Sequence, residues 1–265
     1  MIIRSIVSLA LIAGISFPAI ANDQILATSY SVQDLDTGEI LRSRNDQEVR
    51  SIASITKLMT AVVVLDSGID LTQEVVVKPI PGMHSKLPKN IKLSLYDLMH
   101  LSLMSSDNLA TKILAQHYPG GETSHMLAMN AKAREIGMVN TSYTDPTGLD
   151  ETNVSTAVDL AKLVGHAERY ELIKQFSTTP SYAIDVPGKK HHRTMAFHTT
   201  NHLVAENPNI ILSKTGWIHQ AGGCLVMLVQ EQGRRLAVVL LNSRNTHTRL
   251  RDGELLYGLQ HGKDI

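Results

Sequence analysis

The spacing of apolar and polar residues predicts a β-hairpin followed by a helix near the start of the chain. Residues 29–34 and 40–42 alternate weakly on either side of a turn that contains Asp-Thr-Gly, a pattern typical of a hairpin. From Ile55 to Leu65, apolar residues recur at i, i+3, i+4 and i+7. This period indicates a buried amphipathic helix, which we expect to stop at the Ser-Gly pair ending at Gly68.

A helical block follows an exposed loop over residues 78–89, which is rich in proline. Ser94 with Asp97 three positions later resembles a capping box that starts a helix. Apolar residues at helical spacing predict three further helices, over residues 109–118, 123–136 and 156–164.

Strand patterns return in the last third of the chain. Residues 182–186 alternate, and the apolar residues 210–212 lead into a Lys-Thr-Gly motif that we expect to end a strand. Two continuous apolar runs, residues 224–230 and 236–241, predict a hairpin buried on both faces. A closing helix is predicted over residues 248–260.

This order of elements predicts an α/β fold of the α+β type, with an antiparallel sheet flanked by helices and built from both ends of the chain. We expect one domain over residues 22–265, because this length suits a single large domain. Its sheet subdomain would comprise residues 22–67 and 170–265. An all-helical subdomain would be inserted over residues 68–169.

The N-terminus resembles an export signal. Arg4 is followed by a mostly apolar stretch over residues 6–17 and by Ala-Ile-Ala at residues 19–21, which predicts a signal peptide, residues 1–21, cleaved before Asn22. The alternative is an uncleaved membrane anchor, but about a dozen apolar residues are few for a span.

Composition and charge exclude several classes of function. The formal net charge is zero, with no basic run, so we expect no nucleic-acid partner. Cys224 is the only cysteine, which rules out an intrachain disulfide, and its apolar neighbours predict a small buried side chain. His198 and His202 stand four residues apart, but His-Glu-x-x-His is missing and their segment lacks a helical pattern, so we expect no metal and no other cofactor.

Three short motifs, each near the edge of a predicted element, carry the candidate chemistry. They are Ser54-x-x-Lys57, Ser106-Asp107-Asn108 and Lys214-Thr215-Gly216. Each is weak alone, because a serine can simply cap a helix and a lysine in a first turn is usually solvated. Their order and their settings are harder to obtain by chance.

Together the motifs can supply a nucleophile and its base. Serine is a poor nucleophile at neutral pH, so Ser54 needs an adjacent base, and Lys57 can serve only if burial and a nearby positive charge lower its pKa. Lys214 is the candidate for that charge. Ser106 could relay a proton between either lysine and the leaving amine, and Asn108 could anchor Lys57 or hold a substrate amide.

The same three motifs define the penicilloyl serine transferases, which comprise penicillin-binding proteins and serine β-lactamases. Nearly the whole chain after residue 29 resembles this family. Residues 51–60, 153–157 and 200–204 look most like the D-alanyl-D-alanine endopeptidase branch of the low-molecular-mass penicillin-binding proteins. The resemblance implies a periplasmic enzyme that cuts D-Ala–diaminopimelate cross-links in peptidoglycan peptide stems through an acyl-enzyme on Ser54. It also implies covalent inhibition by β-lactam antibiotics.

The resemblance further implies roles for main-chain groups. In the family's geometry, the oxyanion hole is formed by the N–H groups of Ser54 and Trp217. Gly216 suits the close approach of an extended substrate, and Lys214 and Thr215 offer a charge and a hydroxyl to a stem carboxylate.

Two alternatives remain open on sequence alone. The enzyme could be a D-alanyl-D-alanine carboxypeptidase, or the chain could be a penicillin-binding wall sensor without turnover. A β-lactamase is disfavoured, because the Glu-Pro-x-Leu-Asn loop of class A enzymes is replaced by Asp145-Pro-Thr-Gly-Leu, where Asp145 suits a structural role in a turn. The predicted closing helix lacks a basic face, so we expect at most peripheral membrane or wall association.

Overall fold

The structure is a computed structural model that describes residues 25–83, 85–186, 193–231 and 233–258. The expected signal peptide lies outside the described residues, as do the last two positions of the predicted closing helix.

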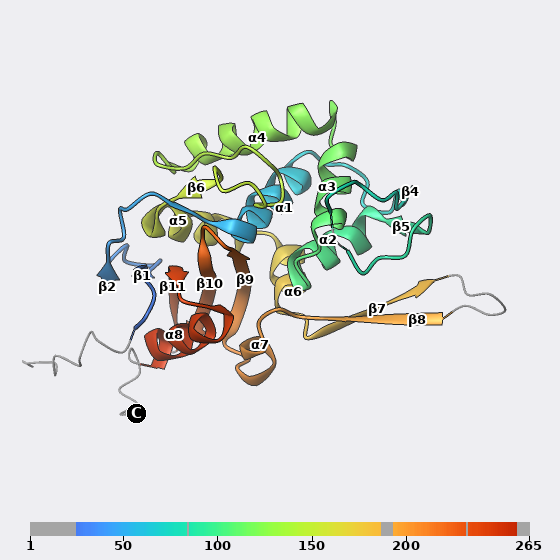
Figure 1. Cartoon of the computed structure of the whole chain (residues 1–265). Helices are drawn as coiled ribbons and strands as arrows, with labels where there is room; N and C mark the ends of the chain where they lie inside the picture. Colours follow the sequence, from blue (N-terminus) through green and yellow to red (C-terminus); the bar gives the residue numbers. More distant parts are fainter. Residues whose placement is uncertain (1–24, 84, 187–192, 232, 259–265) are drawn as a thin grey trace, which may run out of the picture.

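Five antiparallel strands form the central sheet, in the order β2-β1-β11-β10-β9 (Figure 1). Their bounds are Ser29–Asp34 for β1, Ile40–Arg44 for β2, Ile210–Ile218 for β9, Gly222–Glu231 for β10 and Arg234–Ser243 for β11. The first strand pairs directly with the last, with Ser29 opposite Leu241. Both predicted hairpins are therefore confirmed, and the sheet joins the two ends of the chain as expected.

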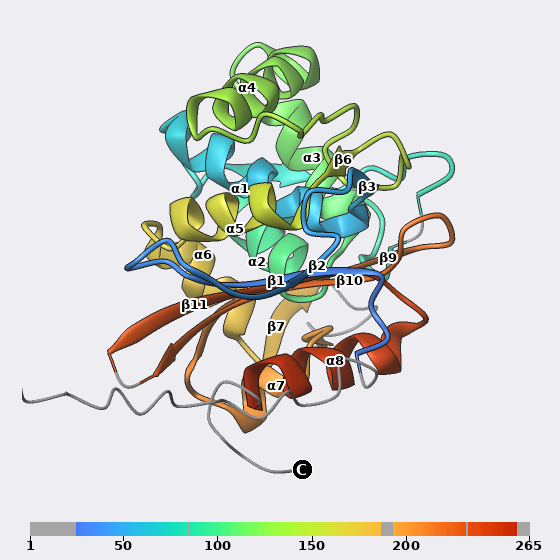
Figure 2. The same cartoon turned by 90° about the vertical axis from the view of Figure 1, so that its left-hand side faces the viewer.

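Helices cover both faces of this sheet. Helix α5 (Ala157–Ala167) packs on β1, β10 and β11, and α8 (Thr246–Gly258) packs on β10 and β11. Figure 2 shows the two helices on opposite sides of the strands. Side chains on both faces of β10 and β11 are consequently buried, which explains why these strands are continuously apolar in sequence.

The helix that carries the first motif lies inside the protein. A short 3₁₀ turn, η2 (Ala53–Ile55), leads into α1 (Thr56–Asp66), and the chain leaves the helix through Gly68 at φ 66°. Every residue of α1 up to Val64 is buried. The helix therefore lacks the solvated face that an amphipathic pattern implies, because helices pack around it from several sides.

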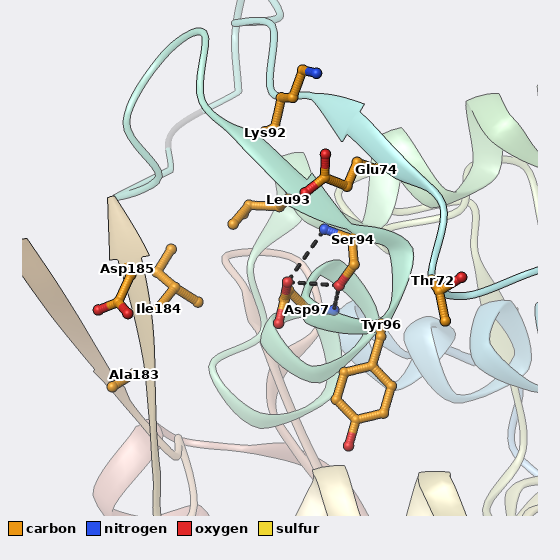
Figure 3. A pocket seen from close by; sticks show the side chains of 10 residues that line it. All are labelled: Thr72, Glu74, Lys92, Leu93, Ser94, Tyr96, Asp97, Ala183, Ile184 and Asp185. Carbon is orange, nitrogen blue, oxygen red and sulfur yellow. Dashed lines mark hydrogen bonds between the residues drawn. The ribbon is translucent and has the colours of Figure 1, made fainter. Parts of the chain in front are cut away.

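Four other helices build the rest of the helical region. They are α2 (Leu95–Met104), α3 (Asn108–His117), α4 (Gly121–Glu135) and α6 (Glu171–Thr178). The predicted capping box is confirmed, because the Ser94 hydroxyl accepts a bond of 3.0 Å from the Asp97 N–H while the Asp97 carboxylate accepts one of 3.2 Å from the Ser94 N–H (Figure 3). Two unsatisfied donors at the helix start are thus paired.

Several short elements were not predicted from the sequence. They include α6, the small helix α7 (Leu203–Glu206) and two ladders, which pair β3 (Arg50–Ser51) with β6 (Val154–Ser155) and β4 (Glu74–Val76) with β5 (Lys92–Ser94). A third ladder pairs β7 (Ser181–Val186), which the alternation over residues 182–186 predicted, with β8 (Arg193–His198), which was not predicted. The Lys-Thr-Gly motif does not end a strand, because β9 continues through it to Ile218. Within the described residues, no helix combines the length and apolar character needed to cross a bilayer.

Candidate active site

The serine and the lysine of the first motif are in direct contact. Ser54 lies in η2 and Lys57 in the first turn of α1, and the Lys57 Nζ to Ser54 Oγ distance is 2.7 Å. The Lys57 side chain is fully buried. The alternative of a solvated first-turn lysine is therefore wrong.

Two further oxygens surround the Lys57 amine. Its Nζ donates to Asn108 Oδ1 at 2.8 Å and to the main-chain oxygen of Thr147 at 2.7 Å. Both oxygens can only accept hydrogen bonds. A neutral amine would donate its two hydrogens to these oxygens, and its lone pair would then face the Ser54 hydroxyl. This arrangement fits a general base.

Burial also favours the neutral form of this amine. It lowers the Lys57 pKa from its ordinary value of 10.5 to about 7, against the opposing effect of the Asp145 and Asp107 carboxylates. Burial and an adjacent positive charge were both expected to lower this pKa. Burial is the largest cause, and burial followed by repulsion between the Lys57 and Lys214 amines lowers the pKa of Lys214.

The second and third motifs meet through Lys214. Its buried Nζ donates to Ser106 Oγ at 2.9 Å and to the main-chain oxygen of Thr215 at 2.8 Å. Ser106 sits between α2 and α3 with φ 59°, a left-handed backbone that is uncommon outside glycine. Its hydroxyl therefore contacts Lys214, one of the two partners considered for a proton relay.

The third contact of Lys57 comes from the loop around Asp145, for which the sequence predicted a structural role. One oxygen of Asp145 accepts from the N–H of Thr147 at 2.6 Å and from the Gly148 N–H at 3.1 Å. The other accepts from Asn153 Nδ2 and from the Asp150 N–H, both at 2.8 Å. A carboxylate with this many donors has little capacity left for a water molecule, which agrees with a structural role.

The strand that carries the third motif packs closely against Ser54. A Cβ built on Gly216 would lie 3.0 Å from the Ser54 main-chain nitrogen and 2.9 Å from the Ile52 oxygen. Glycine is therefore required where β9 passes η2. The Gly216 oxygen accepts a bond of 2.8 Å from the buried Arg249 of α8, and Trp217 follows with half of its side chain exposed.

Four residues of the site were not predicted from the sequence: Thr147, Gly148, Thr200 and Arg249. The first two lie within the Asp-Pro-Thr-Gly loop that was noted only for its aspartate. Thr200 Oγ1 lies 2.6 Å from Thr215 Oγ1, which joins the segment after β8 to the Lys-Thr-Gly strand. No sequence pattern connects Arg249 to Gly216, because a helix 33 residues away makes the contact.

The other residues considered from the sequence, Cys224, His198 and His202, lie outside the group of motif residues. Cys224 is fully buried, and burial raises the pKa of its thiol to about 11, which suits an inert core residue. His198 ends β8 and His202 precedes α7. A hollow of about 550 Å³ between β5 and β7 contains no motif residue (Figure 3).

A second hollow lies beside the motifs. It has a volume of about 590 Å³, and its walls come from the loop after β4, the break between α2 and α3, and the end of β8. It is lined by Ser85, Lys86, Ser105, Ser106, Asp107, Asn108 and residues 196–200.

Comparisons with known proteins agree with these observations. A family model described as D-alanyl-D-alanine carboxypeptidase, peptidase S11, matches residues 17–245. The chain is 41% identical to the D-alanyl-D-alanine endopeptidases of Escherichia coli and Pseudomonas aeruginosa over 239 residues, which is 88% of this chain and 76% of each relative. It is 29% identical to the D-alanyl-D-alanine carboxypeptidase DacF of Bacillus subtilis, over 82% of this chain and 57% of that protein.

Solved structures show the same fold. The Streptomyces K15 DD-transpeptidase superposes with a TM-score of 0.83 at 25% identity, covering 89% of this chain and 97% of that chain. The cefotaxime-bound penicillin-binding protein D2 of Listeria monocytogenes gives a TM-score of 0.78 at 25% identity, covering 89% and 98%. With the three motifs assembled around Ser54, the chain belongs to the peptidase S11 family, the D-alanyl-D-alanine carboxypeptidase family.

Proposed function

We propose that the protein is a serine DD-peptidase that cleaves peptidoglycan peptide stems after a D-Ala carbonyl, mainly as an endopeptidase on D-Ala–diaminopimelate cross-links. The observation that carries the proposal is the buried Lys57 amine, held by Asn108 and Thr147 and directed at the Ser54 hydroxyl. The preference for cross-links is supported by 41% identity to two D-alanyl-D-alanine endopeptidases.

In the proposed acylation step, the Ser54 oxygen attacks the D-Ala carbonyl while Lys57 takes the hydroxyl proton. The negative charge that develops on the carbonyl oxygen is stabilised by the main-chain N–H groups of Ser54 and Trp217. Such donors are effective because they are fixed before the charge forms. The substrate stem runs along β9, where Gly216 leaves room for its backbone.

The leaving amine needs a proton when its bond to the carbonyl carbon breaks. Ser106 is suited to deliver it, because its hydroxyl accepts a hydrogen bond from Lys214 Nζ and lies at the edge of the same site. Lys214 and Thr215 would also hold the carboxylate beside the scissile nitrogen. A water molecule then hydrolyses the acyl-enzyme and restores Ser54.

β-Lactams are proposed to acylate the same serine. This is supported by the β-lactam-bound relative of the same fold. Asp145 is engaged by neighbouring N–H groups, so it is a poor candidate for activating a deacylating water. We therefore expect a long-lived penicilloyl-enzyme, and rapid turnover of benzylpenicillin would contradict this.

The proposal includes export and a single catalytic domain over residues 22–265. Export to the periplasm is supported by the signal-peptide pattern and by the location of peptidoglycan, with at most peripheral association with the wall or membrane. The two alternatives are a carboxypeptidase, supported by the family description, and a penicillin-binding wall sensor without turnover.

One experiment separates these possibilities. Fluorescent penicillin is added to the wild type and to Ser54→Ala, and mass spectrometry follows the products from monomeric and cross-linked dimeric muropeptides. We expect labelling of the wild type alone and conversion of dimers to monomers. Release of D-Ala only would favour a carboxypeptidase, labelling without products would favour a sensor, and no labelling would exclude a serine transferase.

A further inference from the structure

The hollow beside Ser106 begins where the leaving group must depart. Its wall includes Ser106 and Asn108 of the second motif, and Thr200, whose hydroxyl lies 2.6 Å from that of Thr215. No residue of η2 or α1 lines it. It therefore extends the site beyond Ser106, away from the nucleophile.

A carboxypeptidase has little use for this space. Free D-Ala carries only a methyl group beyond the nitrogen and the carboxylate, both of which the three motifs would already hold. In a cross-linked substrate, the D-centre of the leaving diamino acid carries a long side chain in place of that methyl, and this chain leads to the rest of the second stem. A volume of about 590 Å³ falls within the ordinary range of ligand pockets, about 300–1,000 Å³.

The walls of the hollow also include a positively charged side chain, that of Lys86. Lys86 is exposed, and no hydrogen bond or ion pair engages its ammonium within the part of the chain that the structure describes. By contrast, the nearby Asp107 carboxylate is engaged, because it accepts from Ser85 Oγ at 2.6 Å and from the Ala110 N–H at 2.9 Å.

The loop that carries Lys86 is fastened to the site. Ser85 Oγ donates to Asp107 and also accepts from the Leu87 N–H at 3.0 Å, and the Leu87 side chain is buried. Residues on both sides of Lys86 are thus tied down, which holds its backbone at the rim of the hollow. The link runs through the central residue of the second motif itself.

We propose that this hollow binds the leaving stem of a cross-linked substrate, and that Lys86 recognises a carboxylate of that stem beyond the one beside the scissile nitrogen. The inference rests on the proposed DD-peptidase function and names the residue that favours cross-links over single stems. Lys86 acts on specificity and takes no part in bond breaking.

The test compares kcat/KM for a cross-linked dimer with kcat/KM for release of D-Ala from a monomeric pentapeptide. We expect the ratio of dimer to monomer activity to fall about fivefold in Lys86→Ala, about the limit for an exposed charge pair, and further, about tenfold, in Lys86→Glu because repulsion is added. Lys86→Arg should retain the ratio. Lys89→Glu is the matched control, since Lys89 is exposed in the same loop but does not line the hollow.

A second arm ties the effect to the substrate charge. Amidating the remaining carboxylates of the leaving stem should lower wild-type dimer cleavage by a similar factor and should have no effect in Lys86→Ala. Equal ratios in the wild type and the Lys86→Glu variant would overturn the inference, even with a fully active enzyme. Failure of the wild type to cleave either substrate would instead overturn the proposed function.

Discussion

The Lys57 Nζ lies 2.7 Å from the main-chain oxygen of Thr147, a residue 90 positions later in the chain. This contact makes the base depend on a loop rather than on its own helix. The loop is shaped by Asp145, whose carboxylate binds the Thr147 N–H. The proton-accepting capacity of Lys57 is therefore set jointly by its burial in α1 and by the geometry of this loop.

The rate of penicillin acylation should rise with pH around neutrality. Lys57 accepts the Ser54 proton only as a neutral amine, and burial lowers its pKa to about 7, so the rate should climb through pH 7 and level off above it. Stopped-flow acylation with a chromogenic β-lactam measures the profile. Lys57→Ala should lower acylation by about 10²–10⁴-fold, the usual contribution of a general base. A flat profile would exclude Lys57 as the titrating base.

The same burial predicts the direction in which pH changes stability. Unfolded Lys57 titrates near 10.5 and the folded residue near 7, so between these values the unfolded chain binds more protons and the free energy of unfolding rises with pH. The contribution is complete above about pH 10.5 and disappears as the pH falls through 7. Lys57→Met should reduce the slope by up to about 1.4 kcal/mol per pH unit, measured by urea unfolding. An unchanged slope would contradict the lowered pKa.

Much of the fold could be predicted because it depends on local patterns. Alternation about the first turn and the paired apolar runs of β10 and β11 each specify a hairpin. The Ser94–Asp97 capping box specifies the start of a helix. Most of the strands that were missed are very short. The β4–β5 and β3–β6 ladders have two or three residues in each strand, too few for a period to be visible.

The site was predictable only as far as its motifs. Lys57 contacts Ser54 and also Asn108 of the second motif, and Lys214 contacts Ser106 of that same motif; the three motifs indicated that these residues would meet. The contact of Thr147 with Lys57 uses a main-chain oxygen, and any residue type has such an oxygen. Sequence cannot identify a contact of this kind, because it arises from the path of the backbone rather than from the side chain.

Gly148 should tolerate no side chain. Its φ is +79°, and a Cβ there would lie 1.9 Å from the Ala53 oxygen and 2.9 Å from the Ser54 nitrogen. Gly38 is a matched control, with φ +77° and open space around its Cβ position. Gly38→Ala should cost about 1–2 kcal/mol of stability, the cost of a left-handed backbone alone.

Gly148→Ala should cost clearly more than this and should also displace the nucleophile. Thermal unfolding measures the first effect, and the rate of penicillin acylation by the folded fraction measures the second. Equal losses in the two variants would show that the loop moves away from η2 at little cost.

Asp145→Asn tests whether this carboxylate shapes the loop or activates water. The negative charge of Asp145 raises the Lys57 pKa, so its removal should shift the midpoint of the acylation profile to lower pH. Losing acceptors for buried donors should cost about 1–3 kcal/mol of stability. The lifetime of the penicilloyl-enzyme, followed by mass spectrometry, should stay the same.

Asp150→Asn is the control, because the Asp150 carboxylate accepts from exposed Thr152, while the Asp150 main-chain N–H that binds Asp145 is unchanged by the substitution. It should leave both the pH midpoint and the lifetime unchanged. A lifetime that increases a hundredfold in Asp145→Asn alone would make Asp145 the base for deacylation.

Trp217 should matter through its main chain rather than its indole ring. The proposed oxyanion hole uses the Trp217 N–H, while half of the side chain is exposed. Proline removes this donor and is tolerated mainly in edge strands, and β9 is at the edge of the sheet. Trp217→Pro should lower the acylation rate by about 10²–10³-fold, the usual cost of losing one oxyanion donor. Trp217→Ala should lower it only a few fold, with circular dichroism confirming that both variants fold. If alanine were as damaging as proline, the ring and not the N–H would be the important group.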